Sequence, residues 1–133
     1  MQTVHVAAGV VFDAQGKVLI CRRKGALEGL WEFPGGKQES GETIEACLQR
    51  ELMEELALSV TVESQYDEVT VSGDDRLLIL HFLKARLTED SALRLSVHGL
   101  AQWVLPQDLG KYAFCPADAE FLQRGYLQGV KTE

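Results

Sequence analysis

The sequence lacks the features that mark secreted, disulfide-bonded or membrane-spanning proteins. It has three cysteines in 133 residues, Cys21, Cys47 and Cys115. They are far apart and form no C-x-x-C pair, which argues against a disulfide framework or zinc site and fits a reducing compartment. No apolar run approaches the roughly 20 residues that span a bilayer, and the N-terminus has no basic region typical of a secretion signal. We therefore expect a cytoplasmic protein without a membrane partner.

Basic residues are also scarce. Lys and Arg number 13 against 20 Asp and Glu, which gives a formal net charge of -7. A protein that follows a nucleic-acid backbone needs clustered Lys and Arg, but the densest basic patch here is 22–24, enough for one small anion. We expect no nucleic-acid polymer as partner. An acidic chain that handles a polyanion would need metal ions as intermediaries.

The length and the 46% hydrophobic content fit one globular domain over 1–133, as a monomer or a homodimer. Strands are predicted at 3–12, 18–23, 30–33, 60–71, 77–86 and 101–105, with turns at 13–17 and 34–36. Helices are predicted at 44–57, capped by Thr43, and at 116–127. Strands flanked by two helices favour a layered α/β (α+β) domain.

Three glutamates, Glu51, Glu54 and Glu55, lie in the second half of the first predicted helix. At 100° per residue they form a patch beside the apolar stripe of Leu48, Leu52 and Leu56. The helix dipole disfavours negative charge at this end. One interpretation is a solvated acidic face in which Arg50 pairs with Glu54. The other is a site for a hard cation, Mg²⁺ or Mn²⁺, which prefers carboxylate oxygens.

The residues upstream favour the metal site. Gly35 and Gly36 allow close backbone approach and can present N–H groups to a phosphate. The spacing is Gly36, five residues, Glu42, seven residues, Arg50-Glu51-Leu52, one residue, Glu54-Glu55, two residues and Leu58. This pattern resembles the Nudix box, here 36–58, and departs from it where Ala57 replaces the usual glycine. The segments VAAGVVF, LICRR, WEFPGGK and PAD are similar to the MutT-like branch and its CTP pyrophosphohydrolase group.

The resemblance implies a Nudix fold, with a mixed, curved β-sheet sandwiched between α-helices. It implies Mg²⁺-dependent hydrolysis of a nucleoside diphosphate linked to another group. In the MutT-like branch the substrate is usually a nucleoside triphosphate, cut to a monophosphate and pyrophosphate. The metal ligands would be the Gly36 carbonyl, Glu51, Glu54 and Glu55. Glu51 or Glu54 would serve as base, and Arg50 would orient a glutamate.

For substrate binding the resemblance points to Arg23, Arg76, Phe33 and Asp118. Arg23 would meet phosphate, Arg76 would lie near the nucleotide, and Phe33 would contact base or sugar. Asp118 occupies the place of a base-reading asparagine; as a carboxylate it would suit an amino-bearing edge such as that of cytosine. Each also has a purely structural interpretation: a solvated strand end, a hairpin charge, a core aromatic and a first-turn helix carboxylate.

One departure leaves the number of metals and the identity of the base open. MutT-like enzymes often carry another glutamate where this chain has Val97 or His98. Two alternatives also stay open: hydrolysis of ADP-ribose or dinucleoside polyphosphates, and a non-catalytic nucleotide-binding sensor. By resemblance, ADP-ribose hydrolases tend to carry a proline downstream of the box, and dinucleoside polyphosphate hydrolases tend to carry a tyrosine there. No proline lies between Pro34 and Pro106 and Tyr66 sits too close to the box, so hydrolysis of these substrates is disfavoured. The intact box glutamates disfavour the second.

Overall fold

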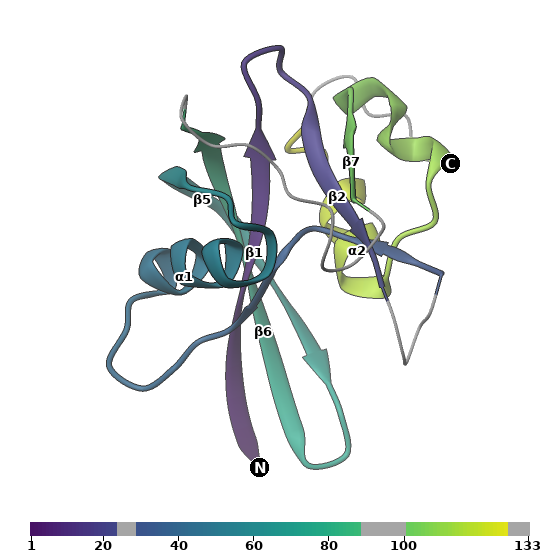
Figure 1. Ribbon diagram of the computed structural model, residues 1–133. Helices are drawn as coiled ribbons and strands as arrows, with labels where there is room; N and C mark the ends of the chain where they lie inside the picture. The colour runs from purple at the N-terminus through teal and green to yellow at the C-terminus, as the bar shows by residue number, and fades with distance from the viewer. Residues whose placement is uncertain (24–28, 89–100, 128–133) are drawn as a thin grey trace.

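The computed structural model describes residues 1–23, 29–88 and 101–127. Within them, four strands precede the first α-helix along the chain, three strands follow it, and a second α-helix comes last (Figure 1). The strands are β1 (Gln2–Phe12), β2 (Val18–Arg22), β3 (Trp31–Glu32), β4 (Gly35–Lys37), β5 (Val60–Ser72), β6 (Arg76–Leu87) and β7 (Ala101–Val104). The helices are α1 (Ile44–Leu56), the 3-10 helix η1 (Pro106–Lys111) and α2 (Pro116–Gln123).

The strands form one mixed sheet in the order β3-β2-β1-β6-β5, with β4 also paired to β1 and β7 to β2. Strands β1 and β6 run parallel along their whole length, from Gln2 opposite Arg76 to Phe12 opposite Arg86. The other pairs are antiparallel. The predicted mixed sheet is therefore confirmed.

Two apolar clusters hold the helices against opposite faces of this sheet. On one face, Ala7, Val11 and Leu19 pack with the predicted α1 stripe, whose members Leu48, Leu52 and Leu56 are all buried. On the other face, Val10, Ile20 and Phe82 pack with Phe121 and Leu122 of α2. Successive residues of β1 point to opposite faces, so one strand serves both clusters. The sheet is thus sandwiched between helices, as the resemblance implied.

The segment that follows β3 differs from its prediction. A turn was expected at 34–36, but Gly35 and Gly36 belong to strand β4 and pair with Ala8 and Ala7 of β1. Gly35 makes this possible because a Cβ at that position would overlap the carbonyl oxygen of Ala7. The glycine pair therefore brings the loop before α1 directly onto the central strand.

The second helix is shorter than predicted. The sequence pattern indicated a helix over 116–127, whereas α2 ends at Gln123. Gly125 follows with φ of +83°, a left-handed conformation that ends helices and suits glycine. The 3-10 helix η1 was not predicted at all. Among the described residues, no helix is both long and apolar enough to cross a membrane.

Candidate active site

Helix α1 starts and ends with defined caps that set the direction of its glutamates. The Thr43 hydroxyl accepts a hydrogen bond from the Ala46 amide at 3.1 Å, as predicted for an N-cap. At the other end Ala57 adopts a left-handed conformation, φ 55° and ψ 33°, and its amide bonds to the carbonyls of Leu52 and Met53. The glycine that usually occupies this position in the Nudix box would adopt the left-handed conformation without steric cost, because it has no Cβ.

Arg50 is the hub of the acidic patch. Its Nε and Nη2 donate to the two oxygens of Glu42 at 3.0 and 2.8 Å, a bidentate pair. Its Nη1 donates to Glu51 at 2.8 Å and to Glu54 at 3.2 Å. The hydrogen bonds from Arg50 hold the pKa of Glu42 down at about 2. The Arg50–Glu54 pair of the solvated-face interpretation exists, but it is the longest of these contacts and Glu42 is the main partner.

Glu55 lies where negative charge accumulates. Burial raises its pKa to about 7, assisted by a hydrogen bond with Glu51 and by the charges of Glu51, Glu32 and Glu54. A divalent cation would relieve this repulsion, so the chemistry of the donor set fits a hard metal ion. Within the described residues no three His, Cys, Asp or Glu side chains already converge on one point. The carboxylates would have to turn toward a shared ion.

Gly36 lies against this cluster from the side of β4. A Cβ on Gly36 would overlap the carboxylate carbon of Glu51, whose side chain is only 15% exposed. The Cys47 thiol, buried beneath the loop, lies 3.5 Å from the Gly36 carbonyl oxygen and can donate to it. The predicted ligand positions Gly36 and Glu51 are therefore packed side by side, although they are distant in the sequence.

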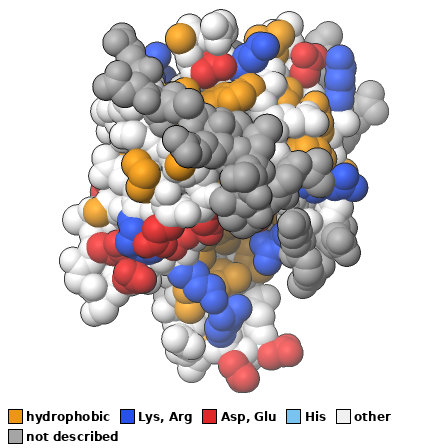
Figure 2. Space-filling view, in the orientation of Figure 1, with side chains coloured by type: hydrophobic (Ala, Val, Ile, Leu, Met, Phe, Trp, Pro, Cys, Tyr) orange, Lys and Arg blue, Asp and Glu red, His pale blue; other side chains and the backbone are white. Residues whose placement is uncertain are grey.

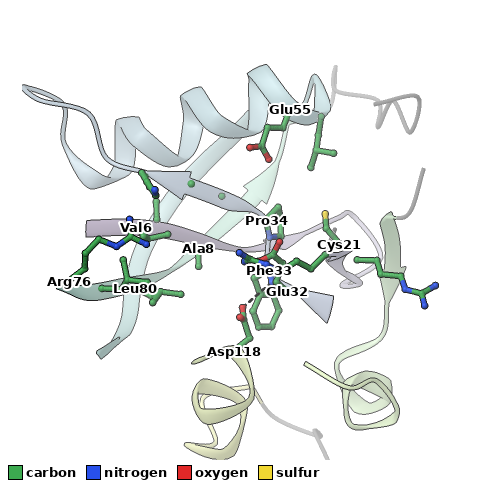
Figure 3. A pocket seen from close by; sticks show the side chains of 18 residues that line it. Val6, Ala8, Cys21, Glu32, Phe33, Pro34, Glu55, Arg76, Leu80 and Asp118 are labelled. Carbon is green, nitrogen blue, oxygen red and sulfur yellow. Dashed lines mark hydrogen bonds and ion pairs between the residues drawn. The ribbon is translucent and has the colours of Figure 1, made fainter. Parts of the chain in front are cut away.

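A pocket of about 500 Å³ opens beside the acidic patch (Figure 3). It brings together six of the nine predicted site residues: Arg23, Phe33, Gly36, Glu55, Arg76 and Asp118. They come from β2, β3, β4, α1, β6 and α2 and the segments next to them. Arg50, Glu51 and Glu54 are not among the lining residues; Glu51 packs against Gly36 of the lining, and Glu54 is 59% exposed.

The pocket is cationic and apolar at once. Arg22, Arg23, Lys37 and Arg76 supply positive charge in a chain whose net charge is -7. Part of the wall is apolar, from Val6, Leu78 and Leu80. Figure 2 shows basic and acidic side chains side by side, next to an apolar hollow. A ligand with both a polyanionic and an apolar part matches this lining.

Asp118 forms the floor of the pocket opposite α1 (Figure 3). It is 4% exposed, and its Oδ1 accepts a hydrogen bond from the Phe33 amide at 3.0 Å. Burial raises the pKa of Asp118 to about 7, with a contribution from the charge of Glu32, against the lowering effect of the Phe33 hydrogen bond. The carboxyl group therefore changes protonation near neutral pH instead of staying ionised.

Phe33 serves the core as well as the pocket. The residue is 4% exposed, and its ring lies edge-on to Phe82 and Phe121, at centroid distances of 6.1 and 5.9 Å. It also stacks on Phe114 at 5.5 Å. The core interpretation thus holds for most of the ring, and its backbone amide is the group that meets Asp118.

Sequence reasoning missed Glu32, Cys21 and Lys37, which also line the pocket. Glu32 pairs with Arg23 at 3.0 Å. Alternation in the LWEF segment was visible, but it could not tell which face Glu32 would take, because that depends on how β3 pairs with β2. The predicted loop position at Val97 or His98 lies outside the described residues.

Comparison with known proteins gives a consistent result. The NUDIX domain model matches residues 2–125. The CTP pyrophosphohydrolase of Escherichia coli K12 is 32% identical over 92% of this chain and 91% of its own. The 8-oxo-dGTP diphosphatase of Proteus vulgaris is 43% identical over 65% of this chain and 83% of its own.

The solved structures point the same way. The solution structure of the E. coli ORF135 protein superposes with a TM-score of 0.79 at 31% identity, covering 92% of this chain and 88% of that one. A MutT structure from a study of the Aliivibrio salmonicida and Vibrio cholerae proteins superposes with a TM-score of 0.73 at 30% identity, covering 92% of this chain and 96% of that one. Together with the box geometry, these matches show that the chain belongs to the NUDIX domain family and is a Nudix hydrolase.

Proposed function

We propose that this Nudix hydrolase cleaves nucleoside triphosphates to a nucleoside monophosphate and pyrophosphate with the help of Mg²⁺ or Mn²⁺. One observation carries the proposal. A single pocket joins Gly36 and Glu55 of the acidic patch to two arginines, Arg23 and Arg76, and to the buried Asp118. Metal-ligand oxygens, phosphate-binding cations and a buried polar group that can read a base are the three parts such a substrate needs.

The names of the relatives support this substrate class. One relative that matches over nine-tenths of both chains is a CTP pyrophosphohydrolase, and another is an 8-oxo-dGTP diphosphatase. Both names describe removal of phosphate groups from a nucleotide. We propose the same for canonical, oxidised or methylated triphosphates here, with a role in nucleotide-pool sanitation. The site would reside in a single domain, 1–133, in the cytoplasm, where the free cysteines suit a reducing medium.

In this proposal Glu51, Glu54, Glu55 and the Gly36 carbonyl hold the metal. A bound divalent cation would neutralise phosphate charge and lower the pKa of a coordinated water. The packing of Glu51 against Gly36 supports this assignment, and so do the burial of Glu55 and the negative charge around it, which together raise its pKa.

The protein's own groups would then orient the reaction. Arg50, anchored by Glu42, holds Glu51 and Glu54 by hydrogen bonds of 2.8 and 3.2 Å. Either glutamate can take the proton of the attacking water as it adds to phosphorus and the anhydride bond breaks. We propose that Arg23 and Arg76 bind the phosphates, and that Phe33 and Asp118 contact the nucleoside.

A turnover screen tests the function. Canonical nucleoside triphosphates, 8-oxo-dGTP and 5-methyl-dCTP would be incubated with Mg²⁺ beside ADP-ribose and diadenosine polyphosphates, and products identified by phosphorus NMR. Monophosphate plus pyrophosphate from a triphosphate, abolished by EDTA and restored by Mg²⁺, is the expected result. Turnover of ADP-ribose alone would replace the substrate class. Binding without turnover of any compound would favour the sensor instead.

A further inference from the structure

Asp67 of β5 connects the sheet to the end of α2. Its Oδ2 accepts hydrogen bonds from Arg124 Nη1 at 2.9 Å and from the Tyr126 hydroxyl at 2.8 Å. Arg124 also donates to the Glu68 carbonyl at 2.9 Å and pairs with Glu120, one turn earlier in the helix. These residues form a small clamp, Asp67–Arg124–Tyr126, at the C-terminal end of α2.

A β-bulge makes the clamp possible. The β5–β6 register runs from Gln65 opposite Leu83 to Asp67 opposite Phe82, which leaves Tyr66 as the extra residue. In a regular strand Tyr66 and Asp67 would point to opposite faces. Here Tyr66 packs on Phe121 at 5.7 Å while Asp67 reaches Arg124 and Tyr126. The bulge thus turns two adjacent side chains toward the same helix.

The turn after α2 completes the arrangement. Gly125 takes the left-handed conformation and reverses the chain, so that Tyr126 comes back over the helix. The Tyr126 ring stacks on Phe121 at 5.7 Å with an interplanar angle of 6°. Phe121 itself stacks on Phe82 of the sheet at 4.3 Å. Tyr126 of the clamp therefore contacts Phe121, the residue that packs α2 against the sheet.

The other end of α2 carries Asp118. Three hydrogen bonds join this end to the segment that follows β2: the Cys115 amide donates to the Trp31 carbonyl at 2.9 Å, the Trp31 amide donates to the Ala113 carbonyl at 2.8 Å, and Asp118 accepts from Phe33. The helix has eight residues, too few to be stable without tertiary contacts. Phe121 and Leu122 anchor this short helix in the core, and the contacts at its C-terminal end add to what sets its position over the pocket.

We infer that Asp67 is a positioning residue for the nucleotide pocket: through Arg124 and Tyr126 it fixes α2 so that Asp118 stays on the Phe33 amide. The inference rests on the proposed function where it concerns the base, but not where it concerns the geometry of Asp118. Loss of the clamp would loosen Asp118 while the acidic patch on α1, on the opposite face of the sheet, keeps its structure.

The test compares Asp67→Ala and Arg124→Ala with Glu63→Ala. Glu63 lies on the same strand and pairs with Arg86 and Lys84 of β6 instead of with α2. The first readout needs no activity: hydrogen exchange of the Phe33 amide. We expect its protection to fall about tenfold in both clamp variants, the scale of a lost hydrogen bond to a carboxyl group. Glu63→Ala should leave it unchanged.

The second readout is selectivity. For the best and worst triphosphates of the turnover screen, the ratio of kcat/KM should narrow by about tenfold in the clamp variants. The change should appear in KM, with kcat kept. The variant that combines Asp67→Ala and Arg124→Ala should lose no more selectivity than either single variant, because the two residues act as one unit.

Unchanged Phe33 protection in both clamp variants, or an equal loss in Glu63→Ala, would overturn the inference. If Asp67→Ala does not fold, Tyr126→Phe can replace it. This variant removes one hydrogen bond only and should lower the protection of the Phe33 amide by a smaller factor. Unchanged protection in a folded Tyr126→Phe protein would contradict the role of the clamp. If the wild-type protein turns over no triphosphate, the proposed function fails, while the exchange of the Phe33 amide still decides on the clamp.

Discussion

Gly36 of β4 and Glu51 of α1 are packed so closely that a Cβ on Gly36 would overlap the Glu51 carboxylate. Gly36→Ala should therefore push Glu51 out of place. Positioning losses of this kind cost roughly 10- to 100-fold in metal affinity or activity. We expect such a loss in kcat/KM with Mg²⁺, and weaker Mn²⁺ binding measured by calorimetry.

Gly73→Ala is the matched control for this prediction. A Cβ on Gly73 would lie at an ordinary 3.5 Å from the Arg76 carbonyl oxygen. The variant should bind Mn²⁺ as the wild type does. A Gly36→Ala protein that binds and turns over normally would show that Glu51 does not need its observed position.

Arg50→Lys keeps the charge but removes the planar fork that holds Glu42 at 2.8 and 3.0 Å and reaches Glu51 and Glu54. A lysine cannot make these contacts simultaneously. We expect kcat to fall roughly 10- to 100-fold, measured at saturating substrate. Arg86→Lys, at a 58% exposed site paired with Glu63 on the neighbouring strand, should change turnover little. Equal effects of the two substitutions would contradict the hub role of Arg50.

Glu54→Gln tests the metal assignment on the most exposed member of the patch. Its side chain is 59% exposed, so the variant should fold normally. Loss of one oxygen ligand or base should still remove most turnover. Glu45→Gln, in the first turn of the same helix, is the control and should keep its activity. Turnover of Glu54→Gln at the wild-type level would rule out its proposed role.

Ala57→Gly should stabilise the protein. Ala57 holds the left-handed conformation at the end of α1, φ 55°, which costs an alanine roughly 1–2 kcal/mol relative to the right-handed region. Glycine avoids this cost but loses some entropy on folding, so a net gain of about 1 kcal/mol is expected in urea unfolding. Ala46→Gly, inside α1, should instead destabilise by about 0.5–1 kcal/mol. If both Ala57→Gly and Ala46→Gly destabilise the protein, the proposed backbone strain at Ala57 is wrong.

Asp118→Asn should change how stability depends on pH. The pKa of Asp118 is raised from 3.8 to about 7 in the folded chain. Between these values the folded state holds a proton that the unfolded state has released, so the free energy of unfolding falls as pH rises. Asparagine removes this fall and can still accept from the Phe33 amide. The variant should gain stability relative to wild type between pH 4 and pH 7, by up to about 4 kcal/mol.

Urea unfolding at pH 4, 5.5, 7 and 8 would measure this difference. Asp118→Ala also removes the acceptor for the Phe33 amide and leaves that buried amide unpaired. Its free energy of unfolding should therefore be lower than that of Asp118→Asn at every pH. A pH-independent difference between wild type and Asp118→Asn would mean that Asp118 is ionised in the folded protein.

The local features of the site were predictable because they depend on short-range chemistry. Thr43 is an N-cap by its own hydroxyl, and the leucine stripe follows from helical period, so the placement of the glutamates on α1 needed only the sequence. The spacing from Gly36 to Leu58 led to the correct family. The turn at 34–36 was wrong because strand β4 exists only through its pairing with β1, which no local pattern specifies.

The sequence alone therefore determined which functional groups are present: oxygen ligands on one helix, an arginine among them, and glycine before them. Tertiary structure decided which groups share a space. The parallel pairing of β1 with β6 carries Arg76 to the pocket, and the packing of α2 on the opposite face of the sheet carries Asp118 there. Strand register and helix docking depend on contacts between residues far apart in the chain, so a sequence read in order does not contain them in any one segment.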